Sequence, residues 1–586
     1  MLANIQTGIL HWDGRLDNRS DLLLRLTDSL RGESSNAAIA RAAYERWGTQ
    51  GFVHLIGDWS LVIRDHKRAT TLLASDFAGV RPLYYHVRQD GRVQWSNRLQ
   101  ALVEETGISA LDEQYIAGFL TFGGCANRTP YKGIYSVPPG SAVCVSPQGR
   151  SICRFWSMPI GDAIRYQSKY RYEEELRALF REAVAVRLQT ESPVLAELSG
   201  GLDSSSVVCM AHHLMRSGEV NTSRLEAVSF TWKNSLDEPF ICEVERHCGI
   251  KGARISTHDV PLVTESQVSG AMPEAFDSLF TSVAKIARRL GAKTILTGQN
   301  GDLIAGNWFD DSLQVAASLR RFQLRRACKE AIAWSGTLRL PVYQVLWRAA
   351  QATLPPSLTP ATIYNTCDGS YAPKSTETSL VTQFSKRTDS ADFSSNDWLH
   401  AAPERRKHFH SLSMALELRT LQAPEQLQDL DYTHPFSHRP LVEFLMSVPA
   451  DVLCRPGEPR ALMRSAFADL WPLGLRERRS KGSFNAPWQE ASRPLARALL
   501  KAKKFHSVER GFVDRDSFRT RLERLCLGLD CNESQLRQII MLELWLQSRN
   551  CSAVKNNFLK LPEQFLKKGG WTNAKQLRGS RTNADR

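Results

Sequence analysis

One short segment of the chain combines residue types that bind an anion. An apolar run of strand type, residues 194–198, leads into two glycines, and a helical pattern begins near Ser204. Glycine lets backbone N–H groups approach a ligand closely, and a helix N-terminus carries about half a positive charge. Serine hydroxyls add further donors. The segment therefore predicts a phosphate-binding turn that comprises Leu198, Ser199, Gly200, Gly201, Ser204 and Ser205.

Asp203 lies inside this turn and decides which phosphate chemistry is expected. Its carboxylate would repel a phosphate unless a cation lay between the two groups. A Mg²⁺ ion that bridges carboxylate and phosphate oxygens resolves this conflict. The alternative is a purely structural turn that is capped by serine and aspartate. The length and specificity of the string favour the phosphate site.

The string resembles the pyrophosphate-binding loop of the ATP-pyrophosphatase superfamily. The sequence contains no GxxxxGK[ST] segment, which marks the other common phosphate loop. The resemblance implies that ATP is cleaved to AMP and pyrophosphate while a carboxylate is activated as its adenylate. It also implies ATP and Mg²⁺ as cofactors.

Further segments, collinear over much of the chain, narrow the resemblance to the asparagine synthetase family. Three of them look like the N-terminal domain of that family, and four look like its synthetase part. The matching segments are residues 13–18, 57–59, 79–85, 296–302, 434–436, 439–443 and 479–484. The resemblance implies that Gly298 binds nucleotide, that Asp203 and Asp302 hold the metal, and that Lys481 is the catalytic cation, which balances negative charge in the reaction.

The chain departs from the family pattern at two places. Glutamine-dependent members begin with a nucleophilic cysteine after the initiator Met, whereas position 2 is Leu2 and the first cysteine is Cys125. We therefore expect no glutaminase activity; a wrong start codon is the alternative. At Gln299 the amide-forming relatives commonly carry glutamate and the β-lactam-forming relatives carry tyrosine. Glutamine is neither an acid nor a base at neutral pH, which points away from simple asparagine synthesis.

Relatives without glutaminase use an amine that the substrate already carries. Residues 432–436 look more like the β-lactam synthetases and the lasso peptide macrolactam synthetases than like asparagine synthetases. The chain is longer than a typical β-lactam synthetase, and its insertions and tail suit a larger peptide substrate, which favours the resemblance to the lasso peptide synthetases. This resemblance implies that an Asp or Glu side chain of a precursor peptide is adenylated and that the peptide's N-terminal amine closes an isopeptide ring. A leader peptidase and a leader-recognition protein are the further partners that it implies. The incoming amine needs a base, and Glu417 and Asp431 are both candidates.

Three other functions remain open on the sequence. The first is an asparagine synthetase that uses free ammonia, and the second is a small-molecule cyclase like the β-lactam synthetases. The third is a nucleotide-binding protein without catalysis. The net charge of +14 is partly a property of residues 551–586, which carry eight basic and two acidic residues. Such a tail is usually solvated, so nucleic acid is not favoured as a partner.

The alternation of patterns predicts an α/β protein with two domains and a tail. Residues 1–155 are expected to be mostly β, with strands that include residues 52–56 and a hairpin at 135–146, and residues 170–550 are expected to form a parallel sheet with a helical C-terminal part. The family resemblance implies that the first region is a degenerate glutaminase-like (Ntn-type) α+β sandwich and that the second is an ATP-pyrophosphatase domain. The basic tail is residues 551–586. With no signal pattern and no apolar run of membrane length, the expected location is the cytoplasm.

Overall fold

The computed structural model describes most of the chain. The described residues are 7–30, 32–121, 126–257, 271–273, 277–306, 310–355, 358, 396–479, 482, 485–502 and 504–551. Three residues on which the sequence predictions depend, Leu2, Cys125 and Lys481, lie outside the described residues, as do residues 552–586 of the tail.

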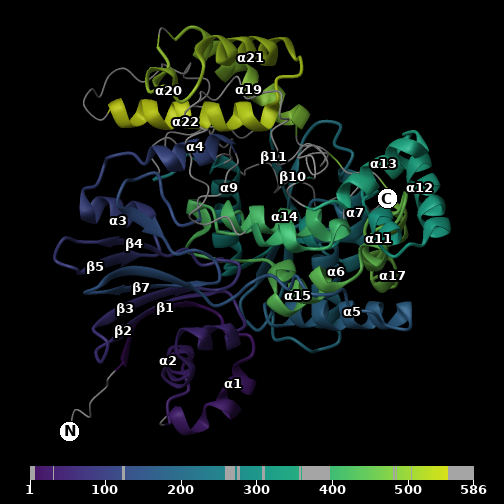
Figure 1. Ribbon diagram of the computed structural model, residues 1–586. Helices are drawn as coiled ribbons and strands as arrows, with labels where there is room; N and C mark the ends of the chain where they lie inside the picture. The colour runs from purple at the N-terminus through teal and green to yellow at the C-terminus, as the bar shows by residue number, and fades with distance from the viewer. Residues whose placement is uncertain are drawn as a thin grey trace, which may run out of the picture.

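The N-terminal part is a sandwich of two antiparallel sheets with helices on its outer faces (Figure 1). The first sheet has the order β1 (Thr7–Gly14), β2 (Trp59–Asp65), β3 (Thr70–Ser75), β7 (Ser141–Ser146) and β8 (Gly149–Arg154). The second sheet has the order β5 (Val93–Ser96), β4 (Tyr84–Val87) and β6 (Ile134–Ser136). The outer helices are α1 (Arg19–Arg25), α2 (Asn36–Trp47), α3 (Leu99–Thr106) and α4 (Glu113–Thr121).

Side chains that alternate between the two faces of each strand explain how this sandwich packs. Leu61 and Ile63 of β2 pack in the cluster that includes α2, whereas Val62 between them packs with β4 residues of the second sheet. Successive side chains of a strand point to opposite faces, so a fully apolar strand supplies both layers. The apolar run of β2 is therefore buried on both sides.

Two local predictions in this part are wrong. Residues 52–56 do not form a strand, because Gly48–His54 forms the 3₁₀ segment η2, in which Phe52 is fully buried against Tyr44 and Trp59. The expected hairpin at 135–146 is two strands of different sheets, since β6 and β7 do not pair with each other. Gly140 lies between them with φ +63°, and this turn carries the chain from one sheet to the other.

The central part contains the predicted parallel sheet, which is confirmed. Its order is β11 (Ala253–Ser256), β10 (Leu225–Thr231), β9 (Val194–Glu197), β12 (Thr294–Leu296) and β13 (Asp431–Thr433), and every pair is parallel. One face packs against α5 (Lys169–Ala185), α6 (Leu202–Arg216) and α7 (Glu238–Cys248), and the other packs against α9 (Asp277–Leu290). In such sheets a ligand binds at the carboxyl ends of the strands.

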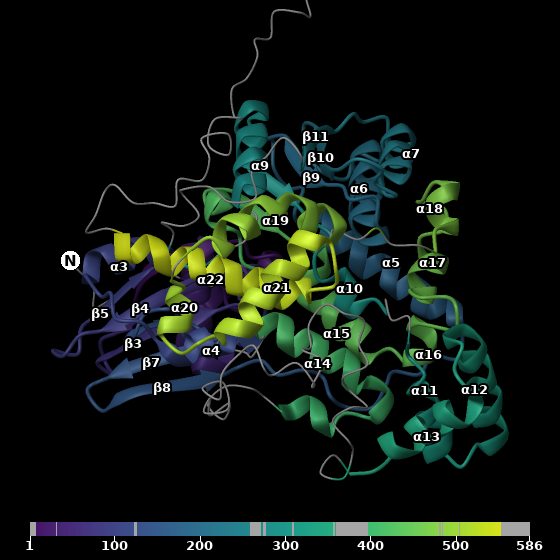
Figure 2. The same cartoon turned by 90° about the horizontal axis from the view of Figure 1, so that it is seen from above.

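The rest of the described chain is mainly helical, as expected (Figures 1 and 2). Helices α14 (Pro403–Glu417) and α15 (Arg439–Ser447) lie beside the parallel sheet domain, next to α10 (Gly301–Ile304). Helices α11 (Gln314–Arg320), α12 (Leu324–Leu338) and α13 (Val342–Ala352) form a separate apolar cluster. Helices α19 (Asn485–Leu500), α20 (His506–Glu509), α21 (Arg515–Leu527) and α22 (Glu533–Cys551) pack over α4. None of the described helices is long and apolar enough to cross a membrane.

Candidate nucleotide site and the domain junction behind it

The predicted phosphate turn connects β9 to α6, and its shape is fixed from within. Gly200 has φ +74°, and a Cβ atom there would lie 2.8 Å from the carbonyl oxygen of Asp237, so only glycine fits. The Ser199 backbone N–H donates to Ser204 Oγ at 3.1 Å, and the two hydroxyl oxygens are 2.9 Å apart. The turn therefore has a defined shape before any ligand binds.

The segment after β12 closes over this turn. A Cβ atom on Gly298 would lie 2.5 Å from the Ser204 backbone nitrogen, so the two segments meet without room for a side chain. His434 holds the second segment: its Nδ1 lies 2.7 Å from Thr297 Oγ1 and its Nε2 lies 2.8 Å from the Leu421 carbonyl oxygen. Burial lowers the pKa of His434 to about 4, so the ring is neutral and structural.

Asp203 and Asp302, the predicted metal ligands, converge on one cationic nitrogen. Arg460 Nη2 lies 2.5 Å from Asp203 Oδ2 and also contacts Asp302 Oδ1. Two carboxylates that share one positive nitrogen can share a divalent cation in the same way. Among the described residues there is no group of three or more metal-ligating side chains. The donor set therefore fits a Mg²⁺ ion whose other ligands are phosphate oxygens and water.

These residues line a cavity of about 370 Å³ at the carboxyl ends of the strands, within the usual size range of ligand pockets. Its wall includes four arginines, which are Arg460, Arg464, Arg478 and Arg479. Arg478 donates to the Gly200 carbonyl oxygen at 2.7 Å and pairs with Asp237, so it fastens the turn to α7. Burial and the neighbouring arginines lower the pKa of Arg464 to about 10, which leaves it protonated at neutral pH. Four positively charged guanidinium groups can pair with the negative charges of a polyphosphate.

Most of the sequence-predicted residues meet in this cavity. Those that line it are Leu198, Ser199, Gly201, Asp203, Ser204, Gly298 and Asp302. Gly200 and Ser205 do not line it: Gly200 presents its carbonyl oxygen to Arg478, and Ser205 is fully buried behind the turn. Lys481 lies outside the described residues, so its role stays a prediction. The sequence analysis missed Arg460 and Arg478, and only the neighbouring resemblance at 479–484 hinted at the second.

The two candidate bases lie away from the cavity. Asp431 pairs with Arg81 and lies 3.7 Å from Arg15 Nη1, both in the N-terminal domain. Glu417 ends α14 and accepts from Ser413 Oγ at 3.0 Å beside a different, small cavity. Neither carboxylate is among the residues that line the nucleotide cavity.

Another carboxylate, Glu197, does line the cavity. It is the last residue of β9 and accepts from the Tyr432 hydroxyl, with an O–O distance of 3.4 Å. Gln299 Nε2 in turn donates to the Tyr432 oxygen at 2.9 Å. Burial raises the pKa of Glu197 to about 7, and the tyrosine opposes this effect only partly.

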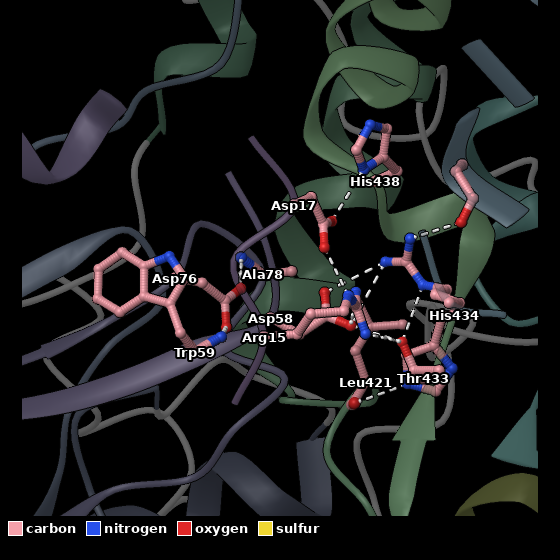
Figure 3. Close-up of polar contacts among 12 residues, drawn as sticks. Arg15, Asp17, Asp58, Trp59, Asp76, Ala78, Leu421, Thr433, His434 and His438 are labelled. Carbon is pink, nitrogen blue, oxygen red and sulfur yellow. Dashed lines mark hydrogen bonds and ion pairs between the residues drawn. The ribbon is translucent and has the colours of Figure 1, made fainter. Parts of the chain in front are cut away.

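On the other face of β13, the two domains meet at a buried carboxylate. Figure 3 shows Arg15 and Thr433 pointing toward Asp58, which follows a motif glycine of the N-terminal domain. Asp58 accepts from Arg15 Nη2 at 2.9 Å, from Arg187 Nη2 at 3.2 Å and from Thr433 Oγ1 at 2.5 Å. Burial would raise the pKa of Asp58, but the two guanidinium groups hold it far below its usual range.

Comparison with known proteins agrees with this order of a sandwich, a parallel sheet and a helical C-terminus. Residues 1–156 match the family model of a glutamine amidotransferase domain, and residues 175–547 match that of asparagine synthase. The chain belongs to the asparagine synthase family. The predicted fold class is confirmed.

The similar proteins are named for different activities. An amidase chry2 of Gibberella zeae is 28% identical over 308 residues, which cover 46% of this chain and 42% of that protein. Asparagine synthetase 3 of Bacillus subtilis is 28% identical over 208 residues, 34% of this chain and 33% of that one. A carboxyethyl-arginine β-lactam synthase of Streptomyces clavuligerus is 29% identical over 221 residues, 36% and 38% of the two chains. The chain thus spans less than half the length of these relatives.

Proposed function

We propose that the protein is an ATP-dependent, AMP-forming ligase that makes an amide bond. The observation that carries this proposal is the convergence of Asp203 and Asp302 on one cationic nitrogen beside the turn of residues 198–205. That arrangement supports binding of the MgATP phosphates there. Bound Mg²⁺ would neutralise charge on the departing pyrophosphate, and the four cavity arginines would orient the polyphosphate. Lys481 is proposed as a further cation from the family resemblance.

The acceptor in this proposal is an Asp or Glu side chain of a precursor peptide, and the nucleophile is the peptide's own N-terminal amine. The support is that residues 432–436 resemble the β-lactam and lasso peptide macrolactam synthetases more than the asparagine synthetases, and that the insertions of the chain suit a larger peptide substrate. The structure adds that Tyr432, the first of these residues, reaches the edge of the cavity through Glu197 and Gln299. A leader peptidase and a leader-recognition protein are the partners that this reaction would require.

The N-terminal domain is proposed to serve as a scaffold without glutaminase activity. The described cysteines of this domain, Cys144 and Cys153, lie in strands β7 and β8, and burial raises the pKa of the Cys144 thiol. A raised pKa lowers the fraction of the reactive thiolate. The motif residues Arg15 and Asp58 bind across the junction to the synthetase domain. Release of glutamate from glutamine by the purified protein would contradict this part of the proposal.

The test of the main proposal is ATP–pyrophosphate exchange with the purified full chain. The assay compares no added substrate, free aspartate, carboxyethyl-arginine and the short peptide encoded beside the gene. Exchange that requires the peptide supports adenylation of a peptide carboxylate. Exchange with aspartate alone would make the protein an ammonia-using asparagine synthetase, and the absence of exchange under every condition would contradict adenylation.

A second candidate is a small-molecule cyclase, which the match to the β-lactam synthase favours. It predicts exchange with carboxyethyl-arginine, the compound in that relative's name, in place of the peptide. The same assay therefore separates the two candidates.

A further inference from the structure

Strand β13 brings a tyrosine from the C-terminal half of the chain against a glutamate beside the phosphate turn. β13 pairs in parallel with β12, and β12 pairs in parallel with β9, so the carboxyl ends of all three strands meet at one edge. Glu197 is at the end of β9 and Tyr432 is in β13, and their side-chain oxygens are 3.4 Å apart. Both side chains therefore lie where substrate binds in sheets of this type.

Gln299 fixes the direction of the hydrogen bond between Tyr432 and Glu197. Its Nε2 donates to the Tyr432 oxygen at 2.9 Å, so the tyrosine's own proton points to Glu197 Oε1. Tyr432 is almost fully buried, and burial beside Glu197 raises its own pKa well above the usual value, so it stays a hydrogen-bond donor. The tyrosine therefore orients the carboxylate of Glu197 and stabilises its ionised form.

Three of the four cavity arginines are engaged with groups other than Glu197, and one of them, Arg464, donates to backbone carbonyl oxygens. Arg460 pairs with Asp203 and Asp302, and Arg478 pairs with Asp237. The charged side chains that line the cavity with Glu197 are Asp203, Asp237, Asp302, Arg460, Arg464, Arg478 and Arg479. Burial raises the pKa of Glu197 to about 7, so its ionised and neutral forms are both populated near neutral pH.

We propose that Glu197 is the catalytic base of the amide-forming step, and that Tyr432 and Gln299 are the residues that position it. The proposal rests on the adenylation proposed above. The neutral amine attacks the acyl carbon and forms the C–N bond, and its surplus N–H proton passes to the Glu197 carboxylate. The bond between the acyl carbon and the phosphate oxygen breaks, and AMP leaves with the electron pair. Glu197 then releases the proton to water.

The first test is Glu197→Gln in the full chain, with Glu226→Gln as the matched control. Glu226 lies on the neighbouring strand β10, contacts Arg224 and does not line the cavity. Three rates are compared with the peptide or other substrate that supports exchange: ATP–pyrophosphate exchange, amide formation, and hydroxamate formation with added hydroxylamine. Hydroxylamine is largely unprotonated at neutral pH and traps the adenylate without needing a base.

In Glu197→Gln we expect amide formation to fall about 10²–10⁴-fold, while exchange and hydroxamate formation stay within about two-fold of wild type. An unchanged rate of amide formation would overturn the inference. An equal fall in all three rates would also overturn it, because it would show a structural role. Wild type that gives no exchange with any substrate would refute the adenylation, and this inference would fail with it.

The second test is the pH profile of Tyr432→Phe. The variant lacks the hydrogen bond that lowers the pKa of Glu197, so the rising limb of amide formation is expected to move from near pH 7 to higher pH. The profile of Glu226→Gln should stay at the wild-type position. If the rising limb of the Tyr432→Phe profile stays at the wild-type pH, it reports the ionisation of the attacking amine alone. That result would exclude Tyr432 as a positioning residue.

Discussion

Strand β13 separates a buried carboxylate and a half-buried carboxylate that lie in different electrostatic surroundings. Thr433 donates to Asp58 at the domain junction, and its neighbour Tyr432 donates to Glu197 at the cavity. Asp58 has two guanidinium partners and its pKa falls far below the usual range, whereas the tyrosine is the one side-chain partner of Glu197 among the described residues and the pKa of Glu197 rises to about 7. Desolvation raises the pKa of both groups, so the paired cations decide the difference in charge state.

Asp76 shows that a position near the domain junction does not by itself keep a carboxylate ionised. It accepts from the backbone N–H groups of Trp59 and Ala78 (Figure 3) and from that of Gly79. Burial and the negative charge of Asp58 nevertheless raise its pKa to about 7. A carboxylate needs direct cationic partners to stay ionised in such an interior. Proton uptake is therefore possible at Asp76 beside the junction as well as at Glu197 in the cavity, whereas Asp58 stays ionised between its two guanidinium partners.

The largest expected effect is the loss of stability in Asp58→Asn. The change leaves Arg187, whose side chain is fully buried, without its charged partner. We expect the free energy of unfolding to fall by about 3–5 kcal/mol in urea titrations at pH 7. Glu197→Gln, measured in the same way, should lose no more than about 1 kcal/mol, since among the described residues Glu197 has no cationic partner that the change would leave unpaired. Equal losses of unfolding free energy in Asp58→Asn and Glu197→Gln would show that the two carboxylates do not differ in their dependence on cationic partners.

Asp203→Asn should reverse the pattern, with a large loss of activity and a small loss of stability. Arg460 keeps Asp302 as a partner, so the free energy of unfolding should fall by only about 1 kcal/mol. ATP–pyrophosphate exchange should fall at least about 10²–10³-fold, because the proposed metal ligand is lost. Asp469→Asn, which removes a surface pair with Arg177, is the control and should keep exchange. Exchange that persists in Asp203→Asn would contradict the metal assignment.

Stability should depend on pH in opposite directions at the two sites. The folded-state pKa of Asp58 lies below the unfolded value of 3.8, so its contribution is complete above about pH 5 and is lost as the pH falls. Glu197 is raised from 4.5 to about 7, so its contribution is largest at low pH and is lost as the pH rises through 7. Between pH 5 and pH 8, Glu197→Gln should gain about 1–3 kcal/mol in unfolding free energy relative to wild type. Parallel pH profiles of the two proteins would contradict the raised pKa.

The smallest effects are expected for Asp431→Asn and Glu417→Gln. Asp431 pairs with Arg81 while 29% of its side chain remains exposed, so its loss should cost less than about 1 kcal/mol. Neither residue lines the cavity, so exchange and amide formation should stay within about two-fold of wild type. A specific loss of amide formation in either variant would transfer the role of base from Glu197 to that residue.

The sequence by itself determined the phosphate turn and the order of the folds around it. The turn is local: eight residues hold the strand end, the glycines and the helix start, and Gly200 meets a conformational need that is readable from residue type. The parallel sheet followed from apolar runs that alternate with helical patterns. The strand predicted at 52–56 is absent because this part of the chain belongs to a 3₁₀ segment. Phe52 is buried there against aromatic side chains and does not pair in a sheet.

Only the tertiary structure decided which charged groups meet. Arg460 lies 257 residues from Asp203, and Tyr432 lies 235 residues from Glu197, yet each pair is in contact. Asp431 was a reasonable base by sequence, but alternation along β13 directs it to the arginines of the N-terminal domain and leaves Tyr432 for the cavity. A carboxylate's charge state depends on burial and on its partners through space, and these are properties that residue type and spacing do not contain.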